Sequence, residues 1–464
     1  MSIFKRKDGE IQPYWPIGKY QLRLPFIHYR LETPELIQGV VIFTIGLSMI
    51  EIMRTVLGMS YEAALAIVIL HLILMVLPST LGVPFVSGFI TPVLPVLIVF
   101  LGKFEPGPEA VRALIAVQFV TALIFFLLGV TGLGQKVIKI LPNSLKAGIL
   151  IGAGIGAIMG EIQEGGRLAA TPITLTIGGM LCLYIMFSLH FKKLYAHNRF
   201  FKKIANFGIV PAILIAMVVG WIVGEYSMPQ VQWGITIPNI AELWNVTPFV
   251  VGFPSLSLLI SAIPTGILAY IIAYGDIIVG ENIVRRANEA RKDEKIQYDM
   301  NQVHMVTAVR GFLHSFFAPH PGLAGPLFSA GTASVAERYT FGRKAMDSIF
   351  SGSNSLVISM ICALFVLPLV TFFQPILPVA YSITLILTGY LCVTLGVKQV
   401  NTEEEIGVAV VMAVVLALYG AAYGLMIGMV LYFLIQRKNL LSLKKDGMEK
   451  AVTEKQEEKA EQIS

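Results

Sequence analysis

Long apolar runs separated by short polar stretches fill the chain from residue 36 to residue 436. A helix needs about 20 mostly apolar residues to cross the hydrocarbon of a bilayer. The runs therefore predict an all-α polytopic membrane protein with about fourteen transmembrane segments. The expected spans are Leu36–Gly58, Tyr61–Pro78, Val83–Phe100, Val111–Leu133, Pro142–Gly160, Ile173–Phe191, Gly208–Gly224, Leu256–Val279, Val303–Phe317, Pro326–Glu337, Ser351–Phe373, Val379–Leu395, Ile406–Ala421 and Ala422–Gln436.

Two of these apolar runs are interrupted by residues that break helices. Val83–Pro95 reads VPFVSGFITPVLP, and its counterpart in the second half, Ala318–Thr332, reads APHPGLAGPLFSAGT. Proline lacks an N–H donor and glycine loses the most backbone freedom on folding, so both disfavour regular helix. In hydrocarbon, broken helix persists only where it is buried in protein or lines a cavity. Two such breaks at corresponding places in two halves indicate a midplane binding site.

Charge patterning predicts the orientation. With the N-terminus in the cytoplasm, the even-numbered loops collect Lys and Arg, for example five of them between residues 191 and 203. Cytoplasmic loops carry this excess of positive charge. Seven spans per half invert the second half relative to the first, which predicts a 7+7 inverted repeat. The basic N-terminus lacks an apolar core and is not expected to be a cleaved signal peptide.

Composition narrows the class of function. Only 14% of residues are charged, whereas soluble domains carry roughly 25%. The net charge of +6 is explained by the loops and requires no nucleic acid. Three cysteines lie within apolar runs, and no P-loop, HExxH, CxxC or dinucleotide fingerprint is present. We therefore expect neither an enzyme nor a bound metal or cofactor.

Four stretches together resemble one family, the uracil and xanthine permeases (nucleobase–cation symporters). GVPFVSGFITPVLP is similar to the third-span signature, and LLGVTGLGQKVIKILPNSLKAGILIGAGIGA to the segment that joins the fourth and fifth spans. GDIIVGENIVRRA resembles the eighth span, and EEEIGVAVVMAVVLALYGAAYGLMIGMVLYFLI the closing pair. The same fold is shared with sulfate permeases and bicarbonate transporters, so the resemblance specifies the fold more firmly than the substrate.

The resemblance implies a core domain and a gate domain, each assembled from both halves, and a homodimer that forms through the gate domains. Short strands at the third and tenth spans would meet at the substrate site. The implied divisions are a cytoplasmic N-terminal segment 1–35, core 36–134, gate 135–253, core 254–374, gate 375–436 and a cytoplasmic tail 437–464.

The resemblance also implies which residues contact the substrate. The third span contributes Phe85, Ser87 and Gly88, and the tenth contributes Gly322, Leu323, Ala324 and Gly325. The acidic position of the eighth span falls near Asp276. One departure concerns the tenth helix, which in the family usually starts with a glutamate that hydrogen-bonds the base. Here the sequence is GLAGPLFS, without a carboxylate.

The chemistry of helix starts adds polar candidates. Helix N-termini present unpaired N–H groups and about half a positive charge each, so two of them at one point favour an anion or a polarised carbonyl. Ser87, Thr91 and Ser329 can add hydroxyl donors there. The alternative interpretation is ordinary helix capping and small-residue packing.

Titratable and aromatic side chains within the spans are further candidates. Asp276 lies in an apolar helix, where a carboxylate costs roughly 2.5–3.5 kcal/mol, and it is a candidate for proton or Na⁺ coupling or for substrate contact. Glu51 is a second coupling candidate, unless Arg54 on the same helix face simply neutralises it. His320 can bind substrate or form a structural bond within its loop. Tyr274 can stack on a flat substrate or pack in the core.

Two functional hypotheses follow. The first is a secondary active transporter, an H⁺- or Na⁺-coupled symporter of a nucleobase-like or small weakly acidic solute that works by alternating access. The second is a transporter of inorganic or carboxylate anions on the same fold, which the missing carboxylate of the tenth span favours. A channel or membrane scaffold without coupled transport is a third. We expect the protein in the bilayer of a bacterial inner membrane, with both termini cytoplasmic.

Overall fold

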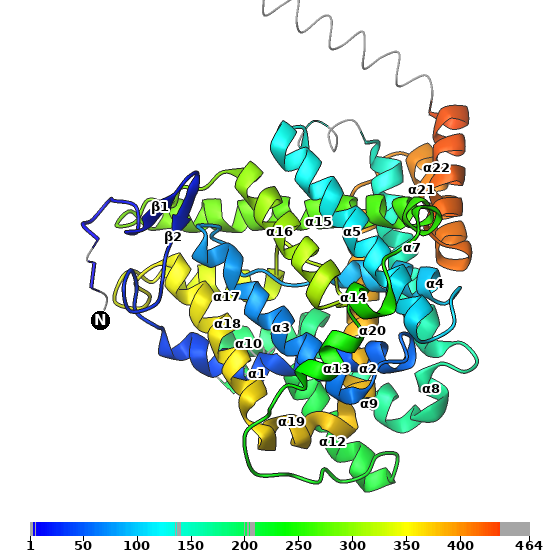
Figure 1. The fold of residues 1–464 in the computed structure, drawn as a ribbon, viewed down its shortest axis with the longest axis horizontal. Helices are drawn as coiled ribbons and strands as arrows, with labels where there is room; N and C mark the ends of the chain where they lie inside the picture. The colour runs from blue at the N-terminus through cyan, green and yellow to red at the C-terminus, as the bar shows by residue number, and fades with distance from the viewer. Residues whose placement is uncertain are drawn as a thin grey trace, which may run out of the picture.

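The structure is a computed structural model that describes residues 3, 4, 6–134, 136, 141–198, 200, 201, 204 and 209–436. The expected cytoplasmic tail, 437–464, lies outside the described residues, as do parts of the basic loops near residues 137 and 203. Helices make up most of the described chain (Figure 1).

The helices follow the apolar runs closely. In the first half they are α1 (Thr33–Leu47), α2 (Met49–Thr55), α3 (Tyr61–Thr80), η1 (Thr91–Val93), α4 (Leu94–Leu101), α5 (Pro108–Thr131), α7 (Asn143–Ile162), α8 (Arg167–Ala170), α9 (Pro172–Phe187), α10 (Leu189–His197) and α12 (Val210–Val223). In the second half they are α13 (Ile240–Asn245), α14 (Pro248–Val251), α15 (Leu256–Ala290), α16 (Met300–Phe317), α17 (Ser329–Tyr339), α18 (Ile349–Phe365), α19 (Leu367–Phe373), η2 (Gln374–Ile376), α20 (Leu377–Val397), α21 (Glu403–Tyr419) and α22 (Ala421–Ile435).

By length and composition alone, six helical stretches of the described chain are long and apolar enough to cross a membrane. Five shorter apolar helices of 10–17 residues accompany them, among them Thr91–Leu101 and Ala421–Ile435. The protein is therefore a helical membrane protein with many spans. The count of fourteen and the 7+7 repeat remain predictions.

Several expected spans have different bounds in the structure, among them the eighth and the eleventh. α15 continues to Ala290 instead of ending at Val279, and it runs across much of the molecule (Figure 1). Its start is capped by Ser255, whose side chain accepts a hydrogen bond from the Leu258 N–H. The run Ser351–Phe373 divides into α18 and α19 at Val366, which has an extended backbone. Pro368 follows in the first turn of α19, where its missing N–H costs no hydrogen bond.

Two groups of helices pack most extensively within themselves. In one, α1 and α3 pack against α18, α5 packs against α15 and α16, and α17 contacts both α15 and α18. In the other, α7 packs against α20 and α21, α21 against α22, and α9 against α12. The expected division of the chain into a core and a gate stays a prediction, as does their movement as separate domains.

The N-terminal segment is folded, although its polar sequence predicted only a cytoplasmic extension. β1 (Trp15–Ile17) and β2 (Tyr20–Leu22) form an antiparallel hairpin, with Trp15 opposite Leu22 and Ile17 opposite Tyr20. Arg23 follows the hairpin, is fully buried, and places its guanidinium 4.0 Å from the ring centroid of Phe350 at the start of α18. The segment is therefore part of the packed molecule.

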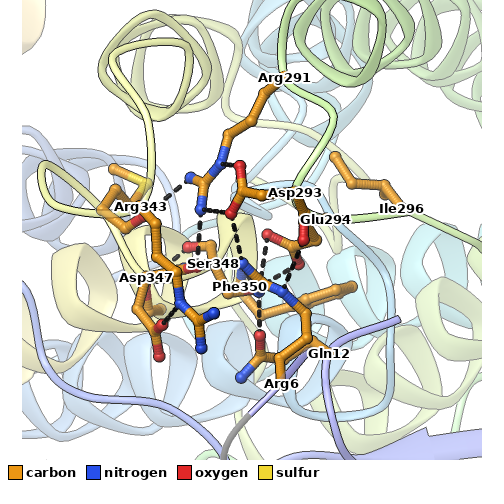
Figure 2. Close-up of polar contacts among 12 residues, drawn as sticks. Arg6, Gln12, Arg291, Asp293, Glu294, Ile296, Arg343, Asp347, Ser348 and Phe350 are labelled. Atoms are coloured by element: carbon orange, nitrogen blue, oxygen red, sulfur yellow. Dashed lines mark hydrogen bonds and ion pairs between the residues drawn. The ribbon is translucent and has the colours of Figure 1, made fainter. Parts of the chain in front are cut away.

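A cluster of charged side chains attaches this segment to the rest of the chain (Figure 2). The guanidinium of Arg6 forms ion pairs with Asp293 at 2.9 Å and Glu294 at 3.2 Å, and the side chains of Arg6 and Glu294 are fully buried. The guanidinium of Arg291 donates two hydrogen bonds to the carboxylate of Asp293, of 2.6 and 2.8 Å. These bonds, with Arg6, hold the pKa of Asp293 at about 2. The cluster joins the N-terminal segment to the α15–α16 loop.

Replacing Arg6 with methionine should lower the stability of the fold. The change leaves Glu294 buried without its cation, and removing one partner of a buried pair costs about 3–5 kcal/mol. We expect a clear fall in the thermal unfolding midpoint of the detergent-purified protein. Arg343→Met is the matched control, because Arg343 is 37% exposed and its ion pairs are 3.4 Å long, so its loss should cost about 1 kcal/mol or less. Equal midpoints for the two variants would contradict this role of Arg6.

Candidate functional site

Both broken spans leave their helices as the prolines and glycines predict. α3 ends at Thr80, and the chain is not helical again until η1 begins at Thr91. In the second half α16 ends at Phe317 and α17 begins at Ser329. We call the two non-helical stretches, 81–90 and 318–328, the first and second crossing segments.

The two crossing segments hydrogen-bond to each other. Gly88 and Gly325 form an antiparallel β-bridge, which is an isolated bridge and not a pair of regular strands. Pairing satisfies backbone groups that would otherwise lie unpaired in a dry interior. The four bonds run from Gly88 N to Gly325 O (3.3 Å), Gly325 N to Gly88 O (3.0 Å), Ile90 N to Gly322 O (2.8 Å) and Phe328 N to Val86 O (2.6 Å).

Glycine is required at this contact because the backbones approach so closely. A Cβ on Gly325 would lie 2.7 Å from the carbonyl carbon of Phe89, and one on Gly322 would lie 2.6 Å from the Phe89 Cβ. Between them, Leu323 adopts a left-handed backbone with φ of 54°, which is uncommon for a residue with a side chain. The second crossing segment is thus fixed in a strained, close-packed conformation.

Arg310 of α16 holds the bridge from one side. Its Nη1 donates to Gly325 O at 2.8 Å, and its Nη2 donates to Gly88 O at 3.0 Å. Each bridge carbonyl therefore accepts one bond from the opposite amide and one from the guanidinium. The Arg310 side chain is fully buried. Our sequence reasoning missed it, although an arginine in the middle of the expected span Val303–Phe317 was a signal for an intramembrane role.

Three buried histidines lie beside Arg310. The rings of His71 and His320 stack with centroids 3.9 Å apart, and His71 Nδ1 lies 3.0 Å from His314 Nε2. His320 also accepts the Gly322 N–H at its Nδ1, and its carbonyl accepts the side-chain amide of Gln118. His320 is therefore placed to shape the second crossing segment. Within the described residues no group of three or more His, Cys, Asp or Glu side chains is arranged to hold a metal ion.

A cavity of about 900 Å³ lies where the two packing groups meet, in front of the helix starts of η1 and α17. Four of the predicted site residues line it: Thr91, Tyr274, Asp276 and Ser329. Residues that the sequence did not single out also line it, among them Phe89, Lys146, Phe328, Thr384 and Thr388. α7 and α20, which supply Lys146 and the two threonines, form the wall opposite the crossing segments.

The remaining predicted residues do not line this cavity. Phe85 is buried with its ring edge against Tyr298, and the Ser87 hydroxyl donates to Met75 O at 2.7 Å. Gly88, Gly322, Leu323, Ala324 and Gly325 build the crossing segments behind the cavity, next to His320. Glu51 lies on α2, away from the residues that line the cavity.

Asp276, on α15, is one of two acidic residues that line the cavity, the other being Glu337. The carboxylate of Asp276 has no hydrogen bond or ion pair with any described residue. Lys146, Glu337 and Lys398 also line the cavity. An unpaired carboxylate in a mostly apolar cavity is available to bind a cation or a polar solute.

Comparison with known families is decisive for the class of protein. The family model described as a permease family (Xan_ur_permease) matches residues 39–321, which contain the first crossing segment, Asp276 and the start of the second crossing segment. The chain belongs to the xanthine and uracil permease family. No curated protein matches the sequence of this permease.

Solved structures share the fold of the permease. The transmembrane domain of the cyanobacterial bicarbonate transporter BicA matches with a TM-score of 0.52 and 14% identity, over 84% of this chain and 97% of that one. Murine solute carrier 26 family member A9, an anion transporter in its inward-facing state, matches with a TM-score of 0.56 and 14% identity, over 88% of this chain and 69% of that one. A second SLC26A9 structure gives 0.55 and 15%, over 87% and 65%. The protein is thus a membrane transporter by family, and these matches support its fold.

Gly325→Ala should abolish transport by separating the crossing segments. The added methyl group would fall 2.7 Å from backbone, which cannot yield as a flexible side chain would. Gly160→Ala is the control, because a Cβ there meets nothing within 4 Å. Uptake into cells and the elution profile of the purified variants measure the result. Normal uptake by Gly325→Ala would show that the close contact is dispensable.

Proposed function

We propose that this permease is a secondary active transporter, a proton- or sodium-coupled symporter of a nucleobase-like or other small weakly acidic solute. The observation that carries the proposal is the unpaired Asp276 in a cavity that also receives the starts of η1 and α17. A solute there would accept hydrogen bonds from the N–H groups at the start of α17 and from the hydroxyls of Thr91 and Ser329. Tyr274 and Phe89 offer rings on which a flat solute can stack.

Alternating access supplies the mechanism. The crossing segments and Asp276 belong to one packing group, and Lys146, Thr384 and Thr388 belong to the other. Movement of the first group against the second would carry the solute and the coupling cation from one side of the bilayer to the other. In this proposal the first group acts as the core and the second as the gate, with Glu51 as a second coupling candidate outside the cavity. We further propose dimerisation through the gate and an inner-membrane location with cytoplasmic termini.

One observation supports a second candidate function, transport of an inorganic or carboxylate anion. Phe328 is the N-cap of α17, and Ser329 and Ala330 are its first residues, so no carboxylate stands at the helix start that faces the cavity. A helix start without a neighbouring negative charge favours an anion.

Uptake of labelled uracil and xanthine into proteoliposomes tests the first proposal. We expect accumulation that depends on an inward proton or sodium gradient, and that stops when the gradient is collapsed with an ionophore. Bicarbonate and formate uptake, measured in parallel, tests the second candidate. Absence of uptake for every base would remove the nucleobase proposal.

Asp276→Asn should uncouple transport from the cation gradient. The amide keeps the size of the side chain but cannot bind a proton or balance a sodium ion. We expect concentrative uptake to fall by at least about tenfold, while solute exchange across the membrane continues. Glu281→Gln, on the same helix but not lining the cavity, is the control and should transport normally. Full gradient-driven uptake by Asp276→Asn would exclude the coupling role.

A further inference from the structure

We propose that Arg310 is a fixed internal cation that makes the site select its solute as an anion. This inference rests on the proposed transport function and specifies the charge of the solute. The surroundings of Arg310 contain polar groups but no described counter-charge. Its guanidinium bonds two backbone carbonyls, and no described carboxylate forms an ion pair with it. The Arg310 Nε has no hydrogen-bond partner among the described residues.

The groups packed around Arg310 do not neutralise it. α16 contributes His314, α3 contributes His71, and the second crossing segment contributes His320. α5 contributes Gln118, which is uncharged. Imidazoles in contact with one another beside an arginine can add positive charge but no negative charge. The interior behind the crossing segments therefore carries a net positive charge.

The positive charge of Arg310 lies beside the crossing segments, whose neighbouring residues line the cavity. Arg310 bonds Gly88 and Gly325, and the neighbouring Phe89 and nearby Phe328 line the cavity. The guanidinium lies 3.0 Å from the carbonyl oxygen of Gly88, the residue before the cavity-lining Phe89. An unscreened charge in a low-dielectric interior acts over such distances far more strongly than in water. The start of α17 adds positive potential on the same side.

The charged groups that line the cavity do not cancel the positive potential from Arg310. Lys146 and Lys398 offset Asp276 and Glu337 in number, so the uncompensated charge is that of Arg310. An anion nevertheless meets repulsion from Asp276 while that carboxylate is ionised. Protonation of Asp276 removes the repulsion, so anion and proton favour each other's binding. An anion that enters together with one proton gives electroneutral symport.

Arg310 acts through the backbone and does not touch the solute, so it is a positioning and specificity-determining residue. A purely structural clamp would show a different mutational pattern. If Arg310 only holds the bridge, Arg310→Lys and Arg310→Gln weaken the binding of every solute alike. If its charge selects the solute, Arg310→Lys keeps the preference for an anion and Arg310→Gln loses it.

Orotate and its amide test the inference, because they share one pyrimidine ring and differ chiefly in charge. Binding is measured from the ligand-dependent shift of the thermal unfolding midpoint of purified full-length protein at constant ionic strength. We expect the wild type to bind orotate about tenfold or more tightly than the amide. We expect Arg310→Lys to retain most of this preference and Arg310→Gln to bind both solutes equally. The elution profile of each variant shows that it is folded.

The outcomes separate this inference from the proposed function. Equal binding of orotate and its amide by the wild type, or a preference that persists in Arg310→Gln, overturns the inference and leaves symport of a neutral base in place. Binding of neither solute, with no base uptake, overturns the nucleobase proposal. The inference is then judged with bicarbonate, which must stabilise the wild type and Arg310→Lys but not Arg310→Gln. Bicarbonate stabilisation that is absent in the wild type, or unchanged in Arg310→Gln, overturns it.

Discussion

The need to pair backbone groups away from water determines how the centre of this permease is built. Each crossing segment alone would leave its N–H and C=O groups unpaired in a dry environment, at a cost of several kcal/mol per group. The bonds between Gly88 and Gly325 and between Ile90 and Gly322 let the two halves of the chain satisfy each other. This pairing also fixes where η1 and α17 begin, and so where their N–H groups point. The cavity is therefore a consequence of backbone pairing, and its side chains are arranged around that pairing.

Supporting the bridge requires polar groups inside an apolar bundle. Arg310 occupies the second acceptor sites of the two bridge carbonyls, and His320 accepts the amide of Gly322. His71 and Gln118 then fix the histidine and the chain before it. Each such group costs free energy when it is buried unpaired, so the layer is stable only as a connected set. α16 packs closely against α5 and also contacts α3, and these three helices supply the layer.

Much of this arrangement could be predicted from the sequence. The remainder could not, because it depends on contacts between segments that are far apart in the chain. Apolar length and broken runs are local properties, so they predicted the helices, the two crossing segments and the cavity residues Thr91, Tyr274, Asp276 and Ser329. Contacts between distant segments are not local. Nothing near Arg310 in the sequence shows that its guanidinium reaches Gly88, 222 residues away. The N-terminal segment likewise reads as polar, and its order comes from partners such as Asp293, 287 residues from Arg6. The family resemblance implied that glycines of the crossing segments contact the substrate, whereas Phe89 and Phe328 line the cavity.

The packing of the helices opposite the crossing segments favours a gate that moves as a rigid unit. α7 and α20 meet through glycines: a Cβ on Gly154 would lie 2.6 Å from Gly389 O, and one on Gly396 would lie 2.7 Å from Ile151. Small residues at such contacts let helix backbones approach closely and leave little room for sliding. The cavity, by contrast, is lined by residues of α7 and α20 from one group and of α15 and α17 from the other. A motion that alternately exposes Asp276 to the two sides is therefore resisted inside each packing group and least resisted between them. The interface that holds the proposed solute site is thus also the interface that we expect to move.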